Sequence, residues 1–395
     1  MARVLCVWEL GGGYGHVAGF LDLALRLRDR GHDVSFAVRD LSRAEAVLGS
    51  RGFRLLQAPV WLRQVGPTVP VNYAEMLYEI GFLDRVGLLG LVRAWRSLFQ
   101  LARPELLIVD HAPTALLAAV GTAIPRALYG PGFFSPPRLT PMPSIRPWLK
   151  VPPDRLLESE TRVLAVMNQV LAALDVAPLA TLSALFEVEE DFLTTLPELD
   201  HYQGRGGARY WGPSFSLDSG VVPEWPAGDG PRIFAYVAAD HRDFERLLGA
   251  LTSLPYPTLV HARSAPVATT QRYRAPNLRF SSEPVTMRLA TREADLVICQ
   301  GSGTTAAALL AGKPVLILSQ HLEQMLTGLH VANRGLGSFV TGDAKAPNYR
   351  QIVRQLLSDS DCSERARRFA EKYASFDQGA QLDAIVARCE ELVAR

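Results

Sequence analysis

The stretch LVICQGSGTTAAALLAGKPVLILSQHLEQ, residues 296–324, has the pattern of a strand, a helix and a second strand. The apolar run 296–298 predicts a buried strand, and residues 304–310 are rich in Ala and Leu, which favour a helix. Gly312 and Pro314 end that helix before a second apolar run. At the helix start, residues 301–304 have small side chains, so an anion can approach backbone N–H groups that the helix dipole makes attractive. We therefore expect a phosphate site there.

A glycine-rich turn has a second explanation, because it also allows a strand and a helix to approach closely. A polar loop after the second strand supports the ligand site, since it lies at the carboxyl edge where open α/β sheets bind ligands. In that loop Glu323 and Gln324 carry groups suited to sugar hydroxyls. The alternative for this pair is the solvated first turn of a helix.

The first 40 residues repeat the pattern, with strands at 4–8 and 33–38 around a helix at 17–28. Glycines precede the helix, but their spacing does not fit a dinucleotide-binding fingerprint. His16 stands where the glycine loop turns into the helix. A helix N-terminus disfavours the charged imidazole, so His16 is a candidate proton acceptor, or alternatively a capping or packing residue.

A base needs a partner that orients it, and Asp110 ends a predicted strand at 103–110 on the same sheet edge. The alternative is that Asp110 caps the helix beginning near Pro113. His111 is either a substrate contact or merely exposed. Residues 130–153 are rich in Pro and aromatic residues, and we interpret them as part of an apolar acceptor pocket or as a rigid, packed connection.

Composition narrows the class of protein. The chain has 395 residues and 48% apolar content, enough for two or three domains. Its net charge of +1 gives no reason to expect a nucleic-acid partner. The four cysteines lack metal-binding spacing, which suggests a reduced, cytoplasmic protein. No apolar run suits a membrane span or a signal peptide, and an amphipathic helix predicted at 80–101 leaves peripheral membrane contact open.

Several motifs together resemble one enzyme family: GSGT at 301–304, GKP at 312–314, EQ at 323–324, NRGLG at 333–337, GGGYGH at 11–16 and RGHDV at 30–34. They are similar to those of GT-B glycosyltransferases, above all the bacterial macrolide and antibiotic group and the UDP-glycosyltransferases of family 1. The resemblance implies an α/β protein with two Rossmann-like domains, whose parallel sheets face each other across a cleft. The implied ranges are an acceptor domain at 1–208, a linker at 209–230, a nucleotide-sugar domain at 231–373 and a helix at 374–395 that returns to the first domain.

The resemblance also implies a reaction: inverting, metal-independent transfer of a sugar from a UDP- or dTDP-linked donor to a small-molecule hydroxyl. His16 would be the base, oriented by Asp110, and no cofactor is needed beyond the nucleotide sugar as co-substrate. The expected acceptor contacts are Tyr14, His111, Phe133 and Phe134. The expected donor contacts are Gly13, Gly15, Ala239, Val285, Cys299, Gly301, Ser302, Gly303, Thr304, Gln320, Glu323 and Gln324.

Two positions depart from the family pattern. Cys299 stands where the family usually has a diphosphate-binding His, and Ala307 stands where it usually has a ribose-binding Glu. Each lost contact is worth about 1.5–3 kcal/mol when it is made. A ribose-binding Glu matters less for a 2′-deoxy nucleotide, which favours dTDP. The departures also leave two alternatives open, a binding protein with a decayed donor site and a sugar-nucleotide epimerase on the same fold.

Overall fold

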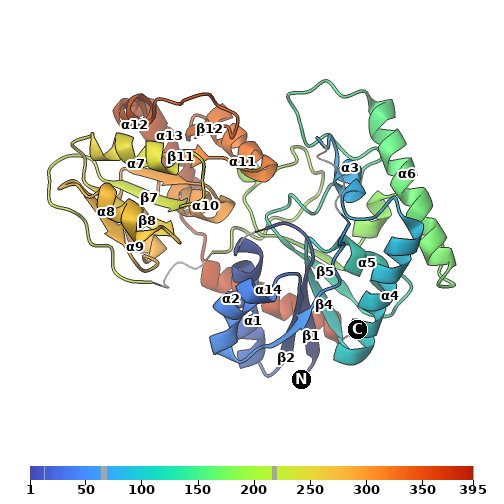
Figure 1. The fold of residues 1–395 in the computed structure, drawn as a ribbon. Coiled ribbons are helices and arrows are strands. Elements are labelled where there is room, and N and C mark those ends of the chain that lie inside the picture. The colour runs from blue at the N-terminus through green and yellow to red at the C-terminus, as the bar shows by residue number, and fades with distance from the viewer. Residues whose placement is uncertain (13, 64–68, 216–219, 395) are drawn as a thin grey trace. The chain divides into compact units, whose positions relative to one another are not determined.

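The computed structural model describes residues 1–12, 14–63, 69–215 and 220–394. The chain forms two compact units, drawn in Figure 1. The first unit comprises Met1–Thr195, Tyr202–Gly212 and Gln378–Arg395, and the second comprises Leu196–His201 and Pro213–Asp377. These units differ from the predicted domain ranges because residues 196–201, before the predicted linker, pack with the second unit.

The first unit is built on a six-stranded parallel sheet with the order β3-β2-β1-β4-β5-β6. Its strands are β1 (Arg3–Trp8), β2 (Asp33–Val38), β3 (Arg54–Gln57), β4 (Leu106–Asp110), β5 (Arg126–Gly130) and β6 (Glu190–Leu193). Its helices are α1 (Gly15–Asp29), α2 (Leu41–Leu48), α3 (Tyr73–Tyr78), α4 (Arg85–Ala102), α5 (Pro113–Ala119), α6 (Pro153–Ala172) and α14 (Gln378–Val393), with short 3₁₀ turns η1 (Gly49–Arg51) and η2 (Ser183–Phe186).

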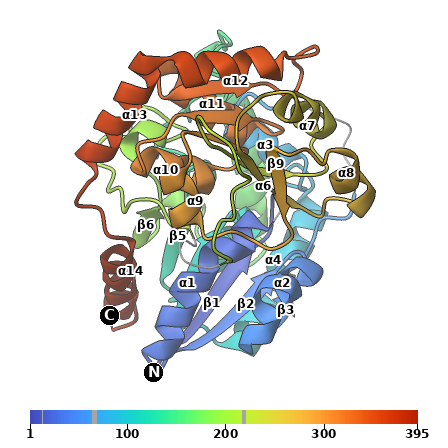
Figure 2. The ribbon, with the colours of Figure 1, turned by 90° about the vertical axis from the view of Figure 1, so that its left-hand side faces the viewer.

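The two faces of this sheet have separate cores. On one face α1, α2 and α14 pack against the sheet, and α3, α4, α5 and α6 cover the other. The C-terminal helix α14 lies beside α1, as Figures 1 and 2 show. Its apolar stripe is buried in the first unit, at Leu382, Ile385, Val386, Cys389 and Leu392.

The second unit repeats the topology, with a parallel sheet of order β12-β11-β10-β7-β8-β9. Its strands are β7 (Ile233–Ala238), β8 (Thr258–Arg263), β9 (Leu278–Ser281), β10 (Leu296–Cys299), β11 (Val315–Leu318) and β12 (Gly337–Val340). Its helices are α7 (Phe244–Thr252), α8 (Val267–Arg272), α9 (Met287–Glu293), α10 (Ser302–Leu310), α11 (Leu322–Asn333), α12 (Tyr349–Ser358) and α13 (Ser360–Lys372), with the 3₁₀ turn η3 (Pro197–Leu199).

Both sheets reverse their strand order at one point, between β1 and β4 in the first unit and between β7 and β10 in the second. Open α/β sheets bind ligands beyond the carboxyl ends of the strands at such a point. The predicted pair of parallel α/β sheets is confirmed. The point of reversal in each sheet is therefore the expected place for a ligand site.

Two predicted elements differ from the structure. The helix expected at 80–101 begins only at Arg85, because Asp84 caps it by accepting the N–H of Gly87 at 2.9 Å. The strand expected at 103–110 begins at Leu106, since Arg103 ends α4 in the left-handed conformation with φ of 48°.

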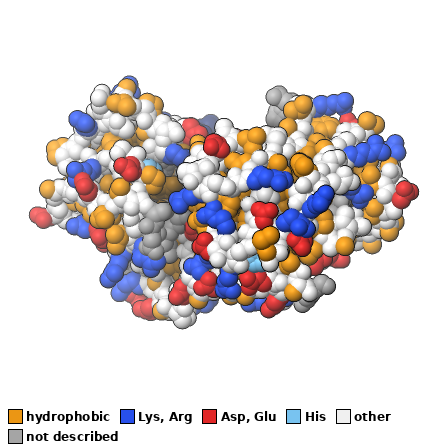
Figure 3. Space-filling model, turned by 90° about the horizontal axis from the view of Figure 1, so that it is seen from below, with side chains coloured by type: hydrophobic (Ala, Val, Ile, Leu, Met, Phe, Trp, Pro, Cys, Tyr) orange, Lys and Arg blue, Asp and Glu red, His pale blue; other side chains and the backbone are white. Residues whose placement is uncertain are grey.

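Charged side chains are mixed by sign on the face of the molecule that Figure 3 shows. The described Lys and Arg residues are interspersed there with Asp and Glu, unlike the single-sign stripe that nucleic-acid binding uses. No helix in the described part of the chain is long and apolar enough to cross a bilayer.

Candidate active site

His16 and Asp110 meet at the carboxyl edge of the first sheet. Asp110 is the last residue of β4 and pairs in register with Trp8, the last residue of β1. His16 lies in the first turn of α1. Its Nδ1 is 2.7 Å from Asp110 Oδ2, and both side chains are about nine-tenths buried. A carboxylate at this distance accepts the Nδ1–H, which places the imidazole lone pair on Nε2.

Gly11 has no side chain that would collide with the imidazole ring of His16. A Cβ atom at Gly11 would lie 2.5 Å from His16 Nε2, and the φ of Gly11 is +85°, which favours glycine. Its carbonyl accepts a hydrogen bond from Arg39 at 3.1 Å. The lack of a side chain at Gly11 therefore leaves room for the imidazole ring of His16. Gly13 of the same loop lies outside the described residues, and Gly15 is the first residue of α1.

Aromatic rings surround His16. Trp8 stacks on it at 5.3 Å between ring centroids, and Phe134 lies at 5.5 Å. His111 lies at 6.3 Å from His16 and stacks on Phe134 at 3.4 Å. The expected acceptor contacts His111 and Phe134 thus lie beside the candidate base. Phe133 is almost fully buried and stacks on Tyr202, so it supports Phe134 from behind.

The remaining expected acceptor residue, Tyr14, precedes α1, and its ring lies under the Arg43 guanidinium at 5.8 Å. A pocket beside Asp110 is also lined by His111, residues 130–132, Phe134 and Ser135. Its volume of about 10 Å³ suits a single water, so an acceptor has to open it or bind at its rim.

His111 carries strain and an unused hydrogen-bonding atom. Its φ is +43°, which is uncommon for a residue other than glycine. Burial, with a smaller contribution from the charge of His16, lowers the pKa of His111 well below its usual value, so the ring is neutral. Its buried Nδ1 has no hydrogen-bond partner among the described residues, and neither has the hydroxyl of Tyr73. These two groups suit a polar atom on a ligand.

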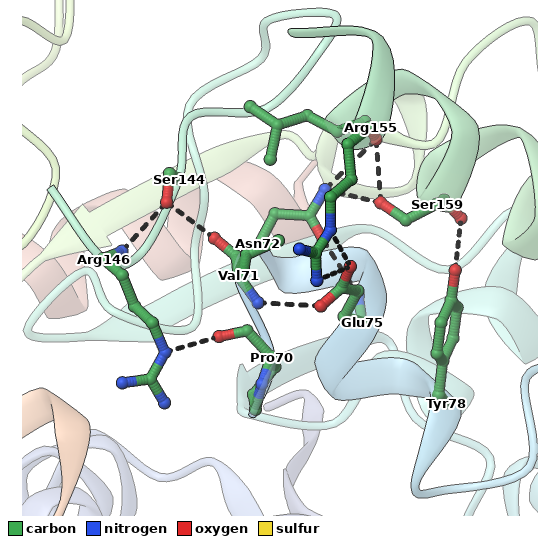
Figure 4. A network of polar contacts seen from close by, with 10 residues as sticks. Pro70, Val71, Asn72, Glu75, Tyr78, Ser144, Arg146, Arg155 and Ser159 are labelled. Atoms are coloured by element: carbon green, nitrogen blue, oxygen red, sulfur yellow. Dashed lines mark hydrogen bonds and ion pairs between the residues drawn. The ribbon is translucent and has the colours of Figure 1, made fainter. Parts of the chain in front are cut away.

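The short helix α3 presents Tyr73 to His111, with ring centroids 6.2 Å apart. A polar network, shown in Figure 4, holds the start of this helix. Asn72 is fully buried, caps α3 through the N–H of Glu75 at 3.0 Å, and donates to Ser159 Oγ at 2.8 Å. Glu75 in turn accepts the Val71 N–H at 2.9 Å. The network fixes α3 to α6 and so fixes the position of Tyr73.

Sequence reasoning assigned no role to Glu9, which follows β1 directly. Its Oε2 accepts the N–H of Thr114 at 2.9 Å, so Glu9 caps α5. Burial raises the pKa of Glu9 to about 7, and the hydrogen bonds from Thr114 and Ala115 lower it only in part. Because Glu9 serves this helix end, Asp110 is not needed as its cap. The only signal in the sequence was a carboxylate directly after a buried strand.

In the second unit α10 begins at the carboxyl edge of β10. Gly301 is the N-cap, and the N–H groups of Ser302, Gly303 and Thr304 precede the first i−4 bond, which Thr305 makes to Gly301 at 3.1 Å. A Cβ atom at Gly301 would meet no atom within 4 Å, and one at Gly303 would only touch Phe215 Cβ at 3.5 Å. Protein contacts therefore do not require these glycines. The idea that they serve only close strand–helix approach is disfavoured.

The thiol of Cys299, an expected donor contact, lies in the core of the second unit. Cys299 is fully buried in β10, and its Sγ is 3.3 Å from Thr305 Oγ1. Burial raises the pKa of its thiol to about 12, so the group is neutral. The side chain of the next residue, Gln300, instead accepts the Ala238 N–H at 2.6 Å and donates to Gln320 Oε1 at 3.3 Å. It ties together the ends of β7, β10 and β11.

Other expected donor residues are engaged within the second unit. Gln324 Oε1 accepts the backbone N–H groups of Gln320 at 2.7 Å and His321 at 3.4 Å, so it caps α11. The N–H of Ala239 bonds to the Arg263 carbonyl at 3.4 Å. These contacts position the loop ends and draw on atoms that a ligand would otherwise use.

Glu323 lies beside Gln324 in the first turn of α11. Its side chain is one-quarter exposed, with Oε1 4.0 Å from His201 Nε2. Val285 forms a bridge with Val221 whose two hydrogen bonds use Pro284 and Thr286, so neither bond uses the peptide groups of Val285 itself. Glu323 and Val285 therefore stay candidates for donor contacts.

No protein-family model matches this sequence, and no curated protein matches it. Solved structures match the fold along the whole chain. A calicheamicin glycosyltransferase, CalG4, is 19% identical over 100% of this chain and 99% of its own, with a TM-score of 0.72. The glycosyltransferase VinC in complex with dTDP is 15% identical over 98% and 100%, with a TM-score of 0.67.

The spinosyn rhamnosyltransferase SpnG complexed with thymidine diphosphate is 18% identical over 98% of this chain and 100% of its own, with a TM-score of 0.65. The sheets of the two units have the same strand order as each other, and the likeness to the solved structures covers both units. The chain has the GT-B fold of these glycosyltransferases.

Proposed function

We propose that this protein is an inverting glycosyltransferase that moves a sugar from a nucleoside diphosphate to a hydroxyl of an apolar or aromatic small molecule. The observation that carries the proposal is the bond of 2.7 Å between His16 Nδ1 and Asp110 Oδ2 at the switch point of the first sheet. This bond would orient His16 as a base at the point where such folds bind their ligands.

In the proposed reaction, His16 Nε2 takes the proton of the acceptor hydroxyl. The acceptor oxygen forms a bond to the anomeric carbon as the bond from that carbon to the phosphate oxygen breaks. Attack opposite the leaving group inverts the anomeric configuration. Asp110 stabilises the imidazolium that forms, and the nucleoside diphosphate leaves with the electron pair of the broken bond. No step calls for a metal ion.

The start of α10 is the proposed site for the diphosphate. Its N–H groups and dipole offset the negative charge that grows on the leaving group. The space in front of Gly301 and Gly303 supports this assignment, because the contacts of the protein do not explain why these positions are glycines. Glu323 and the amide NH2 group of Gln324, whose oxygen caps α11, would face the sugar hydroxyls.

Thymidine diphosphate is the nucleotide that we favour. Ala307, which is buried in α10, offers no carboxylate that could bind a ribose 2′-hydroxyl. The deoxyribose of thymidine diphosphate has no 2′-hydroxyl, so it does not need that contact. VinC and SpnG were solved with this nucleotide. UDP stays the alternative.

The proposed acceptor is apolar, because Trp8, Phe134 and His111 line the surroundings of His16. The buried Nδ1 of His111 and the hydroxyl of Tyr73 would form hydrogen bonds with a second polar atom of that acceptor. An aromatic compound with more than one hydroxyl fits both features.

Calorimetric titration with dTDP, UDP and GDP tests the donor site. We expect one nucleotide to bind at micromolar strength, and Gly301→Ala to weaken it about tenfold or more by obstructing the N–H groups. Gly249→Ala is the matched control, because its Cβ in α7 would also make only an ordinary contact, at 3.8 Å. A turnover assay with the matching nucleotide sugar follows. Binding without turnover would favour a binding protein, and no binding would remove the proposal.

A further inference from the structure

The short segment Leu196–His201 belongs to the second unit, although the chain on both sides of it belongs to the first. Leu196 and Leu199 are buried in the core of the second unit. Between them, Glu198 pairs with Lys372 and accepts the hydroxyl of Tyr373 at 2.5 Å. The segment is therefore firmly anchored at this end.

The other end of the segment runs along one face of α11. His201 is fully buried and contacts Thr327, with Nε2 3.2 Å from Oγ1. His330 hydrogen-bonds to the backbone of His201. Glu323, Thr327 and His330 of α11 follow one another at intervals of four and three positions, which is the spacing of one helix face. The segment thus reaches the first turn of α11, where Glu323 lies.

The hydrogen bonds define which nitrogen of His201 carries a proton. The Thr327 hydroxyl has one proton and donates it to the Glu323 carbonyl at 3.1 Å. Its oxygen can then only accept, so His201 Nε2 must be the donor. The same nitrogen, Nε2, lies 4.0 Å from Glu323 Oε1. The polarised Nε2–H group, which is hydrogen-bonded to Thr327, therefore also lies near the carboxylate group.

We propose that His201 is a positioning residue for Glu323, an inference that rests on the proposed function. The Nε2–H attracts the carboxylate and restricts its rotamers, so that the group is already oriented when the donor sugar arrives. His201 does not touch the ligand. Because it acts on the residue that reads the sugar, it contributes to binding of the sugar and not of the diphosphate.

This difference allows a direct test with four probes, dTDP, dTDP-glucose, UDP and UDP-glucose, titrated calorimetrically into the full chain. For the nucleotide that binds, we expect His201→Ala to weaken the nucleotide sugar about fivefold and the free nucleotide less than about twofold. His201→Gln keeps an N–H donor and should restore most of the loss. Glu323→Ala should remove the effect of His201→Ala in the double variant.

Lys372→Ala is the matched control, because it removes one of the two contacts of Glu198 at the other end of the same segment. We expect it to leave the ratio of the two affinities unchanged. Equal weakening of nucleotide and nucleotide sugar by His201→Ala would show a merely structural role and overturn the inference, as would no weakening of either. If the unaltered protein binds neither dTDP nor UDP, the proposed function itself fails and this inference fails with it.

Discussion

At the residue scale, the bond between His16 and Asp110 combines orientation and charge. A neutral imidazole has two tautomers, and only the one protonated on Nδ1 leaves Nε2 able to take a proton. Asp110 selects this tautomer because its Oδ2 lies 2.7 Å from Nδ1. The pair therefore loses its function if either member keeps its shape but loses its charge or basicity.

Asp110→Asn is the sharpest test of that pair, because the amide has nearly the same shape. We expect kcat to fall by about 10²–10⁴ while the melting temperature and the affinity for nucleotide stay nearly unchanged. His16→Ala should lose a similar factor. Normal turnover by Asp110→Asn would contradict the assignment of Asp110, and transfer by His16→Ala at full rate would remove the base.

Glu9 gives a pH dependence of stability. Its pKa rises from 4.5 to about 7 on folding, so the folded state holds this proton more tightly than the unfolded state does. The contribution is present below pH 4.5 and is lost as the pH rises through about 7, amounting to at most about 3 kcal/mol. We expect Glu9→Gln to remove this slope, because its amide oxygen still accepts the Thr114 N–H without a charge.

Urea unfolding of the unaltered protein and of Glu9→Gln between pH 5 and 8 measures how the free energy of unfolding depends on pH. Other titrating groups contribute equally to both, so the difference between the two curves isolates Glu9. Parallel curves would mean that Glu9 is charged in the folded protein throughout this range.

At the scale of the elements, α4 shows that neighbouring glycines serve different purposes. A Cβ at Gly87 would lie 2.3 Å from the Trp61 ring, whereas a Cβ at the exposed Gly90 would meet nothing within 4 Å. Glycine lowers helix stability where no contact needs it. Gly87 therefore makes room for Trp61, and Gly90 only weakens the helix.

The two alanine variants should change stability in opposite directions. Gly90→Ala should raise the free energy of unfolding by about 0.5–1 kcal/mol. Gly87→Ala should lower it by about 1–3 kcal/mol, because the indole has to move. Denaturant unfolding measures both, and each variant serves as the control for the other. A gain in stability for Gly87→Ala would contradict the contact with Trp61.

At the scale of the whole molecule, the last helix belongs to the unit that begins the chain. Ile385 is fully buried in α14 against the first sheet. We expect Ile385→Ala to lower the stability of the first unit by about 2–5 kcal/mol through the lost contacts and the cavity. Thermal unfolding followed by calorimetry measures this change.

Nucleotide affinity at 20 °C provides a second measurement on the same variant, because the proposed donor residues lie in the second unit. That affinity should stay unchanged while the folded protein persists. Ala384→Gln, at an exposed position of the same helix, is the matched control and should stay within about 0.5 kcal/mol of the unaltered protein. An equal effect of both variants would argue against a buried face of α14.

The cytoplasmic location expected from the cysteines stays a prediction.

The sequence by itself determined the two parallel sheets and the position of the candidate base. Apolar runs, helix periods and glycine breaks are local patterns, and they predict elements because helices and strands each place side chains on one face at a fixed local period. The ends of β1 and β4 followed from the same patterns, which is why His16 and Asp110 could be paired from residues 94 positions apart. The motif at 301–304 likewise predicted where α10 begins, within two residues.

Only the tertiary structure decided how individual side chains are used. Cys299 points into the core because helices cover both faces of β10, and that cover comes from other parts of the chain. Glu9, and not Asp110, caps α5, since that depends on a contact across 105 positions. His201 reaches Thr327 across 126 positions, through a segment that leaves one unit for the other. Such contacts depend on the packing of distant elements, which no local pattern in the sequence encodes.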